Sequence, residues 1–332
     1  MEIIEFAQKP KDSTEPWDVA IVGSGPASLT AAIYTTRGAA STLILGGENW
    51  GGQLMLTTEV DNYPGFSEGI QGPELMQKMK DQSERFGAEF IGKNVDTIDS
   101  GKKYLELTAG GTKYLARAVI VATGAETKWL GVSGEDKLRG RGVSSCAPCD
   151  APFFKDKDVA VIGGGDSAME EALVLSKYSK LVTIVYRKEE FRASAAMQKR
   201  VGENKKIKVI WNSEVKEFVG ENKLEKILLE NNKTGETGEL VVEGVFVAIG
   251  HIPSTTVVKG KLELDEKGYI IVRDNTKTSM EGVFVAGDVH DYHYRQAVTA
   301  AGFGCMAGME ALRYLDEKKE NIIRTSTIDK QG

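Results

Sequence analysis

Short apolar runs that lead into glycines recur along the chain and predict buried strands. Residues 17–22 read WDVAIV and end at Gly23, an alanine-rich stretch follows to about Arg37, and residues 42–45 read TLIL. Apolar runs without polar alternation are typical of strands that are covered on both faces. The order strand, glycine loop, helix and strand therefore predicts a βαβ unit over residues 17–45.

The same pattern returns in the middle of the chain. Residues 159–162 read VAVI, a glycine-rich loop follows at 163–168, and we expect a helix over 169–178 and a strand over 181–185. One G-x-G-x-x-G match is weak evidence, but two matches in strand–loop–helix context predict two dinucleotide-binding units in tandem.

Three further apolar runs end in glycine, at residues 118–124, 244–250 and 282–287. The segment 211–243 reads as antiparallel strands, with turns at Asn231-Asn232 and Gly235. We therefore predict an α/β fold with two Rossmann-like domains of the three-layer ββα type.

The first two of these runs flank the second βαβ unit, so the simplest topology inserts one domain into another. The inserted domain would be residues 126–252, and the outer, discontinuous domain would be residues 1–125 and 253–332. A length of 332 residues agrees with two domains.

Composition and charge exclude several classes of protein. With 41% hydrophobic and 27% charged residues, the chain is typical of globular proteins. The net charge of −6 leaves no basic excess for a phosphate polymer, so we expect no nucleic-acid partner. Three cysteines are too few for a disulfide scaffold.

The N-terminal residues and the lengths of the apolar stretches indicate where in the cell the protein is expected. Residues 1–16 are acidic and lack a positively charged region followed by an apolar stretch, so we expect no signal peptide. No window offers about 18 uninterrupted apolar residues, so we expect no membrane span. We expect a cytoplasmic protein, in which a cysteine pair is more typical of catalysis than of structure.

The first glycine loop has the features of a pyrophosphate site. Gly23 and Gly25 would let a pyrophosphate approach the unpaired N–H groups of the helix N-terminus. Pro26 stands where the first turn of a helix tolerates proline, and Ser28 takes the third small position. The alternative is a tight turn without a ligand, which the second, similar loop makes less favoured.

The second loop indicates a pyridine nucleotide. Its candidate binding residues are Gly163, Gly165, Asp166, Ser167 and Ala168. After the following strand an NAD site needs a carboxylate, but this chain has Arg187, Lys188 and Arg192, a cationic cluster suited to a 2′-phosphate. We therefore favour NADPH over NADH. The alternative is a solvated charged turn, to which Glu189 and Glu190 lend weight.

Cys146 and Cys149 form a C-x-x-C motif just before the second unit. In this context the spacing is typical of a redox-active dithiol, and Asp150 is placed to exchange a proton with a thiolate. The alternative is half of a zinc site, but its other ligands would have to come from scattered residues: Cys305, His251, His290 and His293. We expect no metal, and we expect Cys305 to be a buried, unreactive thiol.

The order of the motifs resembles that of the low-molecular-weight thioredoxin reductases of bacteria, fungi and plants. These are FAD-dependent members of the pyridine nucleotide-disulfide oxidoreductase family. The similarity covers essentially residues 17–316. The motifs that carry it are Gly23–Ala27, Gly51–Leu54, Asp61–Gly65, Ala122–Gly124, Cys146–Asp150, Gly163–Ala168, Ala286–Val289 and Tyr294–Ala297.

The resemblance implies that FAD binds the outer domain and NADPH the inserted domain, which also carries the dithiol. Asp288 would bind the ribityl chain, and the helix that starts near Arg295 would point its positive end at the ring. The alternatives are a helix cap or turn for Asp288 and an Asx-turn for Asn62. The implied FAD residues are Gly23, Ser24, Gly25, Pro26, Ala27, Gly51, Gly52, Gln53, Leu54, Asn62, Thr123, Gly124, Gly287, Asp288, Arg295, Gln296 and Ala297.

The resemblance also implies the reaction. Electrons would pass from NADPH through FAD to the Cys146–Cys149 disulfide and then to the disulfide of thioredoxin or a similar protein. Cys149 would face the flavin, Cys146 would attack the partner, and Asp150 would move protons. The family also implies a homodimer. Because the dithiol and the nicotinamide site would share the inserted domain and both need the same flavin, we expect that domain to rotate about hinges near Glu126 and Pro253.

Three departures from the family's pattern accompany the resemblance. Ala151 and Pro152 follow Asp150 in place of glycine, Tyr186-Arg187-Lys188 replaces His-Arg-Arg, and Ser28 stands in the first loop. Two rival functions remain at this stage. One is a flavin-dependent dithiol oxidase or a ferredoxin-fed reductase, and the other is a non-enzymatic sensor of nucleotide or redox state.

Overall fold

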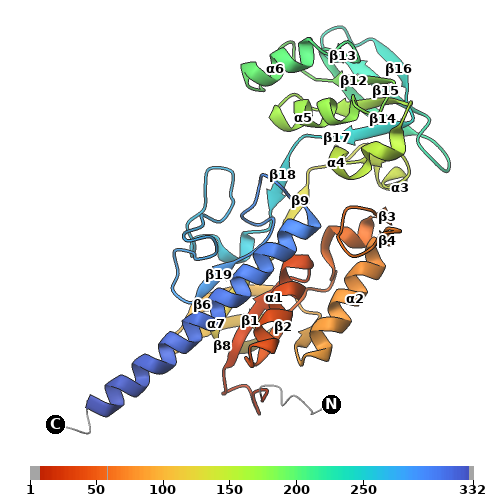
Figure 1. The fold of residues 1–332 in the computed structure, drawn as a ribbon. Helices are drawn as coiled ribbons and strands as arrows, with labels where there is room; N and C mark the ends of the chain where they lie inside the picture. The colour runs from red at the N-terminus through yellow and green to blue at the C-terminus, as the bar shows by residue number, and fades with distance from the viewer. Residues whose placement is uncertain (1–7, 58, 329–332) are drawn as a thin grey trace. The chain divides into compact units, whose positions relative to one another are not determined.

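The chain folds into two compact units, as Figure 1 shows. The computed structural model describes residues 8–57 and 59–328. Unit 1 consists of Met1–Glu126 and Ile252–Gly332, and unit 2 of Thr127–His251, one residue inside each end of the insertion expected from the sequence. The chain crosses between the units in two short strands that pair with each other, β9 (Ala125–Thr127) and β18 (His251–Pro253).

Unit 1 is built on a seven-stranded sheet in the order β5-β2-β1-β8-β7-β6, with β19 also paired to β8. The long strand β8 pairs antiparallel with β7 along its first half and parallel with β1 and β19 along its second half. The strands are β1 (Trp17–Val22), β2 (Thr42–Leu45), β5 (Glu89–Ile91), β6 (Val95–Ser100), β7 (Leu105–Ala109), β8 (Thr112–Val121) and β19 (Val283–Val285).

Both faces of β1 are buried, as its unbroken apolar run predicts. Val19 and Ile21 pack on one face with the helices, and Ala20 and Val22 pack on the other with β6 and β7. The remaining elements of unit 1 are α1 (Pro26–Arg37), α2 (Gly72–Arg85), α7 (Ala297–Ile328), the 3₁₀ helices η1 (Gly52–Leu56) and η3 (Thr256–Val258), and the hairpin of β3 (Glu59–Val60) and β4 (Ile70–Gln71).

Unit 2 has the predicted three layers. A five-stranded parallel sheet in the order β10-β17-β11-β12-β13 lies between helices and a three-stranded antiparallel sheet, β14-β15-β16. The strands are β10 (Val143–Ser144), β11 (Asp158–Ile162), β12 (Leu181–Val185), β13 (Ile207–Ile210), β14 (Ser213–Val219), β15 (Lys226–Asn231), β16 (Thr237–Val241) and β17 (Gly244–Val247).

Alternate residues of β11 face the two outer layers. Val159 and Val161 pack against the helical layer, whereas Ala160 and Ile162 pack against the antiparallel sheet. The helices are α3 (Glu135–Leu138), α4 (Ala147–Asp150), η2 (Ala151–Phe154), α5 (Asp166–Leu175) and α6 (Ala195–Gly202).

The predicted helix over 169–178 is α5, which starts and ends three residues earlier. It begins directly after Gly165, because the N–H of Met169 already donates to the Gly165 carbonyl at 3.2 Å. In the described part of the chain, no helix has the length and hydropathy needed to cross a membrane.

Candidate functional site: two glycine loops and a disulfide

The first glycine loop joins β1 to α1, and its inner side packs closely against the end of β8. Gly23 has φ +118°, and a Cβ there would lie 2.1 Å from the Ala122 carbonyl oxygen at the end of β8. The hydroxyl of buried Ser24 donates to the Gly46 carbonyl at 2.6 Å and accepts the Gly51 N–H at 2.9 Å. Ser24 therefore ties together the loops that follow β1 and β2.

The outer side of this loop is open. A Cβ built on Gly25, the residue before α1, meets nothing within 4 Å, so the N-terminus of α1 is accessible to an anion. Pro26 is the first residue of α1, and Ala27 beside it is buried. Gly52 lies close by, since a Cβ there would be 3.7 Å from the Gly25 Cα.

Other predicted FAD residues gather at the same end of the sheet. The Gln53 side-chain amide donates to the Ala125 carbonyl, and the Thr123 hydroxyl donates to the Ser254 carbonyl at 2.7 Å. Gly124 has φ +72°, which favours glycine. Leu54 in η1 is half-buried.

Asp288 is the charged group of this site. It follows β19 after Gly287, whose φ of +78° and close approach to Ala27 favour glycine. Burial, together with the negative charge of Asp291, raises the pKa of Asp288 to about 7, and Arg295 opposes this rise. Asp288 Oδ1 is buried and has no hydrogen-bond partner among the described residues.

The segment that leads into α7 is organised by Asp291, which was not among the site residues predicted from the sequence. Its carboxylate accepts the N–H groups of His293 at 2.9 Å, Tyr294 at 3.0 Å and Arg295 at 3.3 Å. Arg295 has φ +48°, and α7 starts at Ala297. Asp291 thus sets the direction of α7 as it leaves the site.

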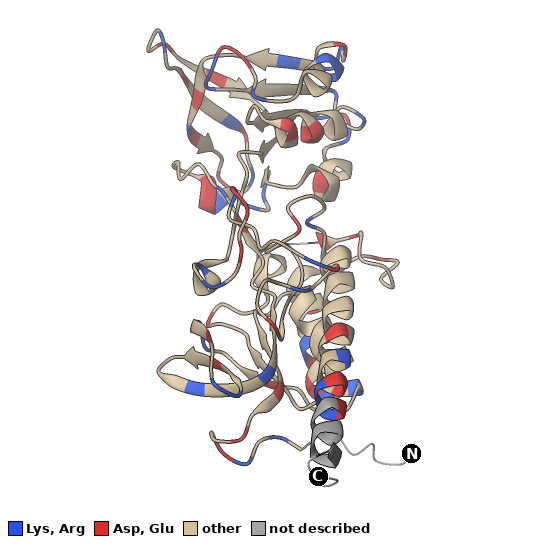
Figure 2. Ribbon diagram, turned by 90° about the vertical axis from the view of Figure 1, so that its left-hand side faces the viewer, with Lys and Arg blue, Asp and Glu red and all other residues tan. Residues whose placement is uncertain are grey.

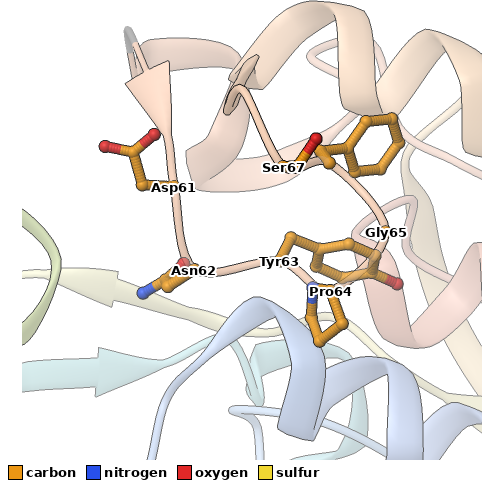
Figure 3. A pocket seen from close by; sticks show the side chains of 7 residues that line it. Asp61, Asn62, Tyr63, Pro64, Gly65 and Ser67 are labelled. Carbon is orange, nitrogen blue, oxygen red and sulfur yellow. The ribbon is translucent and has the colours of Figure 1, made fainter.

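Asn62 connects a distant loop to this segment. Its side-chain amide donates to Gln296 Oε1 at 3.2 Å. Figure 3 shows this loop, residues 61–67, which lines a hollow of about 480 Å³, with Asn62, Tyr63 and Pro64 on the side of the C-terminal part of the chain. Asn62 and Gln296, both predicted from the sequence, are therefore in contact.

The second glycine loop joins β11 to α5 and repeats the geometry of the first. Gly163 has φ +150°, and a Cβ there would lie 2.4 Å from the Ala248 carbonyl and 3.0 Å from the Ala168 Cβ. A Cβ on Gly165 meets nothing within 4 Å, so the N-terminus of α5 is open. Asp166 instead faces Ser194, whose N–H and hydroxyl both donate to it at 2.8 Å.

The cationic turn after β12 is tied to this loop. Arg192 donates its backbone N–H to the Gly164 carbonyl at 2.8 Å. Arg187, Lys188 and Arg192 are exposed, and none of the three forms an ion pair with a described residue. Glu189, which favoured the solvated-turn alternative, forms an ion pair with Lys233 that lowers its pKa. Unpaired positive charge therefore lies beside the second loop.

The dithiol lies at the start of α4 and is oxidised. Cys146 and Cys149 form a disulfide with a Cα–Cα distance of 5.3 Å. The Ser144 hydroxyl accepts the Cys146 N–H at 3.1 Å. Burial raises the pKa of Asp150, and a hydrogen bond with Ser144 opposes this rise. Ser144 therefore contacts both ends of the dithiol segment.

The residues after Asp150 continue as a 3₁₀ helix, η2. Ala151 is buried, Pro152 stands in the first turn, and Phe153 is 43% exposed. Phe154 packs edge-on against Phe246 with ring centroids 5.3 Å apart. Ala151 and Pro152, which stand in place of the family's glycine, therefore form a regular 3₁₀ turn, and Phe154 packs the end of this turn against Phe246.

The expectation of a buried Cys305 is wrong. Cys305 is half-exposed on α7, and its thiol lies 3.9 Å from the Met309 sulfur. Tyr34 of α1 lies beside it, and the hydrogen bond between them raises the pKa of Tyr34. Gly304 and Gly308, on either side of Cys305 in the sequence, contact α1 closely, but Cys305 itself is only partly covered.

His290 and His293 lie in different environments. His290 packs edge-on against Phe303, and burial lowers its pKa to about 4, whereas His293 is exposed. No cluster of three or more His, Cys, Asp or Glu side chains suited to a metal occurs in the described residues.

Glu48 is a candidate that the sequence reasoning missed. It follows β2 in unit 1, where this type of fold places the carboxylate that binds the adenosine ribose, and its N–H donates to Asn94 Oδ1 at 3.2 Å. The same positional rule was applied after β12 and would have found Glu48 after β2.

Tandem dinucleotide folds joined to a redox disulfide define the class of pyridine-nucleotide-dependent disulfide oxidoreductases. A family model described as pyridine nucleotide-disulphide oxidoreductase matches residues 17–304. A thioredoxin reductase of Streptomyces clavuligerus is 52% identical over 301 residues, 90% of this chain and 94% of that protein.

Two further relatives extend the comparison. A bifunctional thioredoxin reductase/thioredoxin of Mycobacterium leprae is 50% identical over 302 residues, 90% of this chain and 66% of that protein. The crystal structure of a thioredoxin reductase from Streptococcus pyogenes superposes with a TM-score of 0.87 at 42% identity, covering 91% of this chain and 98% of that one.

The chain belongs to the pyridine nucleotide-disulphide oxidoreductase family, in its thioredoxin reductase branch. It is therefore an enzyme that uses a flavin and a pyridine nucleotide. The glycine loops and the unpartnered Asp288 oxygen fit such ligands, because they present open N–H groups and a buried acceptor.

Proposed function

We propose that this enzyme reduces the disulfide of a cytoplasmic thioredoxin with electrons from NADPH, using bound FAD and the Cys146–Cys149 pair. The observation that carries the proposal is the disulfide itself, in the same unit as an open dinucleotide loop. The family of the chain and the names of its relatives support it.

FAD is proposed for unit 1. Its pyrophosphate would lie on Ser24–Ala27 at the open N-terminus of α1, and Asp288 Oδ1 would accept a hydrogen bond from a ribityl hydroxyl. When bound, the flavin supplies two-electron transfer between a nicotinamide and a disulfide. The loops around Gly52, Gln53 and Asn62 would hold its ring.

NADPH rather than NADH is proposed for unit 2. The exposed Arg187, Lys188 and Arg192 would bind the 2′-phosphate, since none of them is neutralised by a described carboxylate. Lys188 offers a point charge where arginine offers a fork, so its contact with phosphate is less directional.

The dithiol carries out the exchange with the partner. Reduction of the Cys146–Cys149 bond takes two electrons and leaves two thiols. The Cys146 thiolate then attacks the partner's disulfide and forms a mixed disulfide. Cys149 attacks Cys146 in turn, which restores the internal bond and releases the partner as a dithiol. Asp150, whose pKa is raised, would hold and return a proton in these steps.

Thioredoxin is proposed as the partner because a relative from Mycobacterium leprae unites thioredoxin reductase and thioredoxin in one chain. A homodimer is also proposed. An exposed apolar stripe on α7 supports it, formed by Val298, Met306 and Met309, which are 38–42% exposed. Together with Gly302 and Cys305, these positions follow helical spacing along one face, and we call them the α7 stripe.

The test is to trap the mixed disulfide. A Cys149→Ser, Cys305→Ser variant, reduced and mixed with a thioredoxin that keeps only its attacked cysteine, activated as a mixed disulfide with a small aromatic thiol, should form a covalent complex through Cys146 and release the aromatic thiol. The matched Cys146→Ser, Cys305→Ser variant should form little or none. Trapping only in the second variant would reverse the roles of the two cysteines, and trapping in neither would contradict the function.

The comparisons do not favour a dithiol oxidase or a ferredoxin-fed reductase. Anaerobic addition of one equivalent of NADPH separates these functions from the proposed one. NADPH should bleach the visible absorbance of the bound flavin, and NADH should do so far less effectively. A flavin that NADPH leaves oxidised would contradict the proposed electron donor.

A further inference from the structure

Tyr186 stands directly after β12, where the family's pattern has histidine, and it is almost completely buried. Only 5% of the residue is exposed, and its hydroxyl oxygen has no hydrogen-bond partner among the described residues. Leaving a buried hydroxyl without a hydrogen-bond partner is unfavourable. A ligand that accepted a hydrogen bond from this hydroxyl would remove that cost.

The edge of the ring that carries the hydroxyl lies over the second glycine loop. A Cβ on Gly164 would be 2.4 Å from both Cε2 and Cζ of Tyr186, so the loop and the ring are in direct contact. The ring also stacks on Phe191, with centroids 5.7 Å apart and planes inclined by 28°. The ring thus contacts both Phe191 and the loop.

The same loop offers the other donors of an anion site. Gly165 precedes α5 and has an open outer side, and the N–H groups at the start of α5 face outward there. Arg192 fixes the Gly164 carbonyl through its backbone N–H, which holds the loop against the tyrosine. The Tyr186 ring and the open N-terminus of α5 therefore both adjoin the loop Gly163–Gly165.

We propose that the Tyr186 hydroxyl donates a hydrogen bond to the pyrophosphate of the bound pyridine nucleotide. This inference rests on the proposed use of a nicotinamide dinucleotide. The pyrophosphate is common to NADPH and NADH, so Tyr186 sets the affinity for both. Arg187, Lys188 and Arg192, which are exposed and lie outside the loop, set the preference between them.

The test compares Tyr186→Phe with the matched control Tyr178→Phe, which alters a tyrosine that is 40% exposed in the same unit. The full-length chain with its bound flavin is titrated calorimetrically with NADP⁺, NAD⁺ and 2′-AMP, which has no pyrophosphate. Tyr186→Phe should raise the Kd of NADP⁺ and NAD⁺ by the same factor, roughly tenfold for a bond to a charged acceptor. The Kd of 2′-AMP should not change.

A thermal melt without nucleotide keeps the result interpretable. Because Tyr186→Phe removes an unpartnered hydroxyl, its Tm should equal or exceed that of the wild type, so weaker binding would not reflect lost folding. Unchanged Kd values, or a loss confined to NADP⁺ and 2′-AMP, would overturn the assignment. If the wild type itself bound no dinucleotide, the proposed function would fail instead.

Discussion

At the scale of single residues, the two units hold buried carboxyl groups whose pKa values are raised by their surroundings. Asp288 stands at the end of β19 with an unpartnered oxygen, and Asp150 stands beside the disulfide with Ser144 as its partner. A hydrogen-bonded partner holds the pKa down, whereas Asp288 has only the charge of Arg295 to oppose burial. The pKa of Asp288 should therefore depend more strongly than that of Asp150 on whether a ligand occupies its site.

The raised pKa of Asp288 predicts a pH dependence of the flavin-free protein. Between the ordinary value of 3.8 and the folded value of about 7, the folded state binds a proton that the unfolded state has lost. The free energy of unfolding should thus fall as pH rises through this window, by roughly 4 kcal/mol at most. Asp288→Asn should remove this loss.

Urea denaturation of wild type and Asp288→Asn at pH 5 and pH 8 measures the effect. The difference between the two proteins matters, because His290, whose pKa is lowered to about 4, contributes a slope of opposite sign to both. Asp316→Asn, on the exposed side of α7, serves as the control. A difference that stays constant with pH would contradict the buried, unpartnered carboxyl.

At the scale of elements, the close packing of α1 against α7 positions the first glycine loop. A Cβ on Gly304 of α7 would lie 2.1 Å from the Ala27 carbonyl oxygen of α1, and one on Gly287 would lie 2.9 Å from the Ala27 Cβ. Because α1 begins at the loop, any separation of these helices displaces the N–H groups that face the pyrophosphate. Packing and binding therefore depend on the same glycines.

Two glycines of α7 provide a matched test. Gly304→Ala should destabilise the protein by roughly 1–3 kcal/mol and weaken flavin retention, because the contact is with backbone and cannot relax through a rotamer. Gly302→Ala, where a Cβ meets nothing within 4 Å, should gain up to about 1 kcal/mol of helix stability. Denaturation midpoints and the flavin-to-protein absorbance ratio measure both. Equal effects would contradict the packing account.

At the scale of the whole molecule, charge is distributed unevenly along α7. Figure 2 shows no charged residue near the start of the helix and both red and blue residues farther along, before the part drawn in grey. The uncharged part contains the α7 stripe, whose Met306 and Met309 are 38% and 41% exposed. Contiguous exposed apolar surface of this kind is typical of an interface between protein chains.

The homodimer proposal predicts that a charge in the α7 stripe breaks the assembly. The wild type should sediment as a dimer, and Met306→Lys combined with Met309→Lys should sediment as a monomer, because burying two ammonium groups at an interface is unfavourable. Val241→Lys, which alters a valine 72% exposed on β16, should leave the mass unchanged. A monomeric wild type, or a dimer that survives both charges, would contradict this interface.

Local patterns were enough to predict much of the fold. The runs at 17–22 and 159–162, each followed by a glycine loop, predicted β1 and β11 and the helices after them, because a strand covered on both faces needs unbroken apolar residues. The positions of the flanking runs also placed the insertion within one residue of the observed boundaries. The helix after β11 was predicted three residues too late at both ends, since α5 is Asp166–Leu175.

Contacts between distant segments could not be predicted in this way. From the sequence, Glu189 supported the alternative of a solvated charged turn after β12. In the fold, Glu189 instead pairs with Lys233, which is 44 positions away in the chain. Cys305 was expected to be buried, yet its thiol is half-exposed where α7 lies beside Tyr34 of α1. No sequence periodicity or motif predicts the Glu189–Lys233 ion pair or the exposure of Cys305, because each depends on which faces of two distant elements meet.

The amino-acid sequence by itself determined the two nucleotide-binding units, their nesting, and the dithiol with its neighbouring Asp150, because glycine loops and cysteine spacing act through local backbone geometry. Only the tertiary structure decided which polar groups lack partners. Asp288 Oδ1 and the Tyr186 hydroxyl are both buried without a hydrogen-bond partner in the described part of the chain, which only the packed fold reveals. Burial is a property of the packed fold, and it is burial that turns an ordinary side chain into a group that needs a ligand.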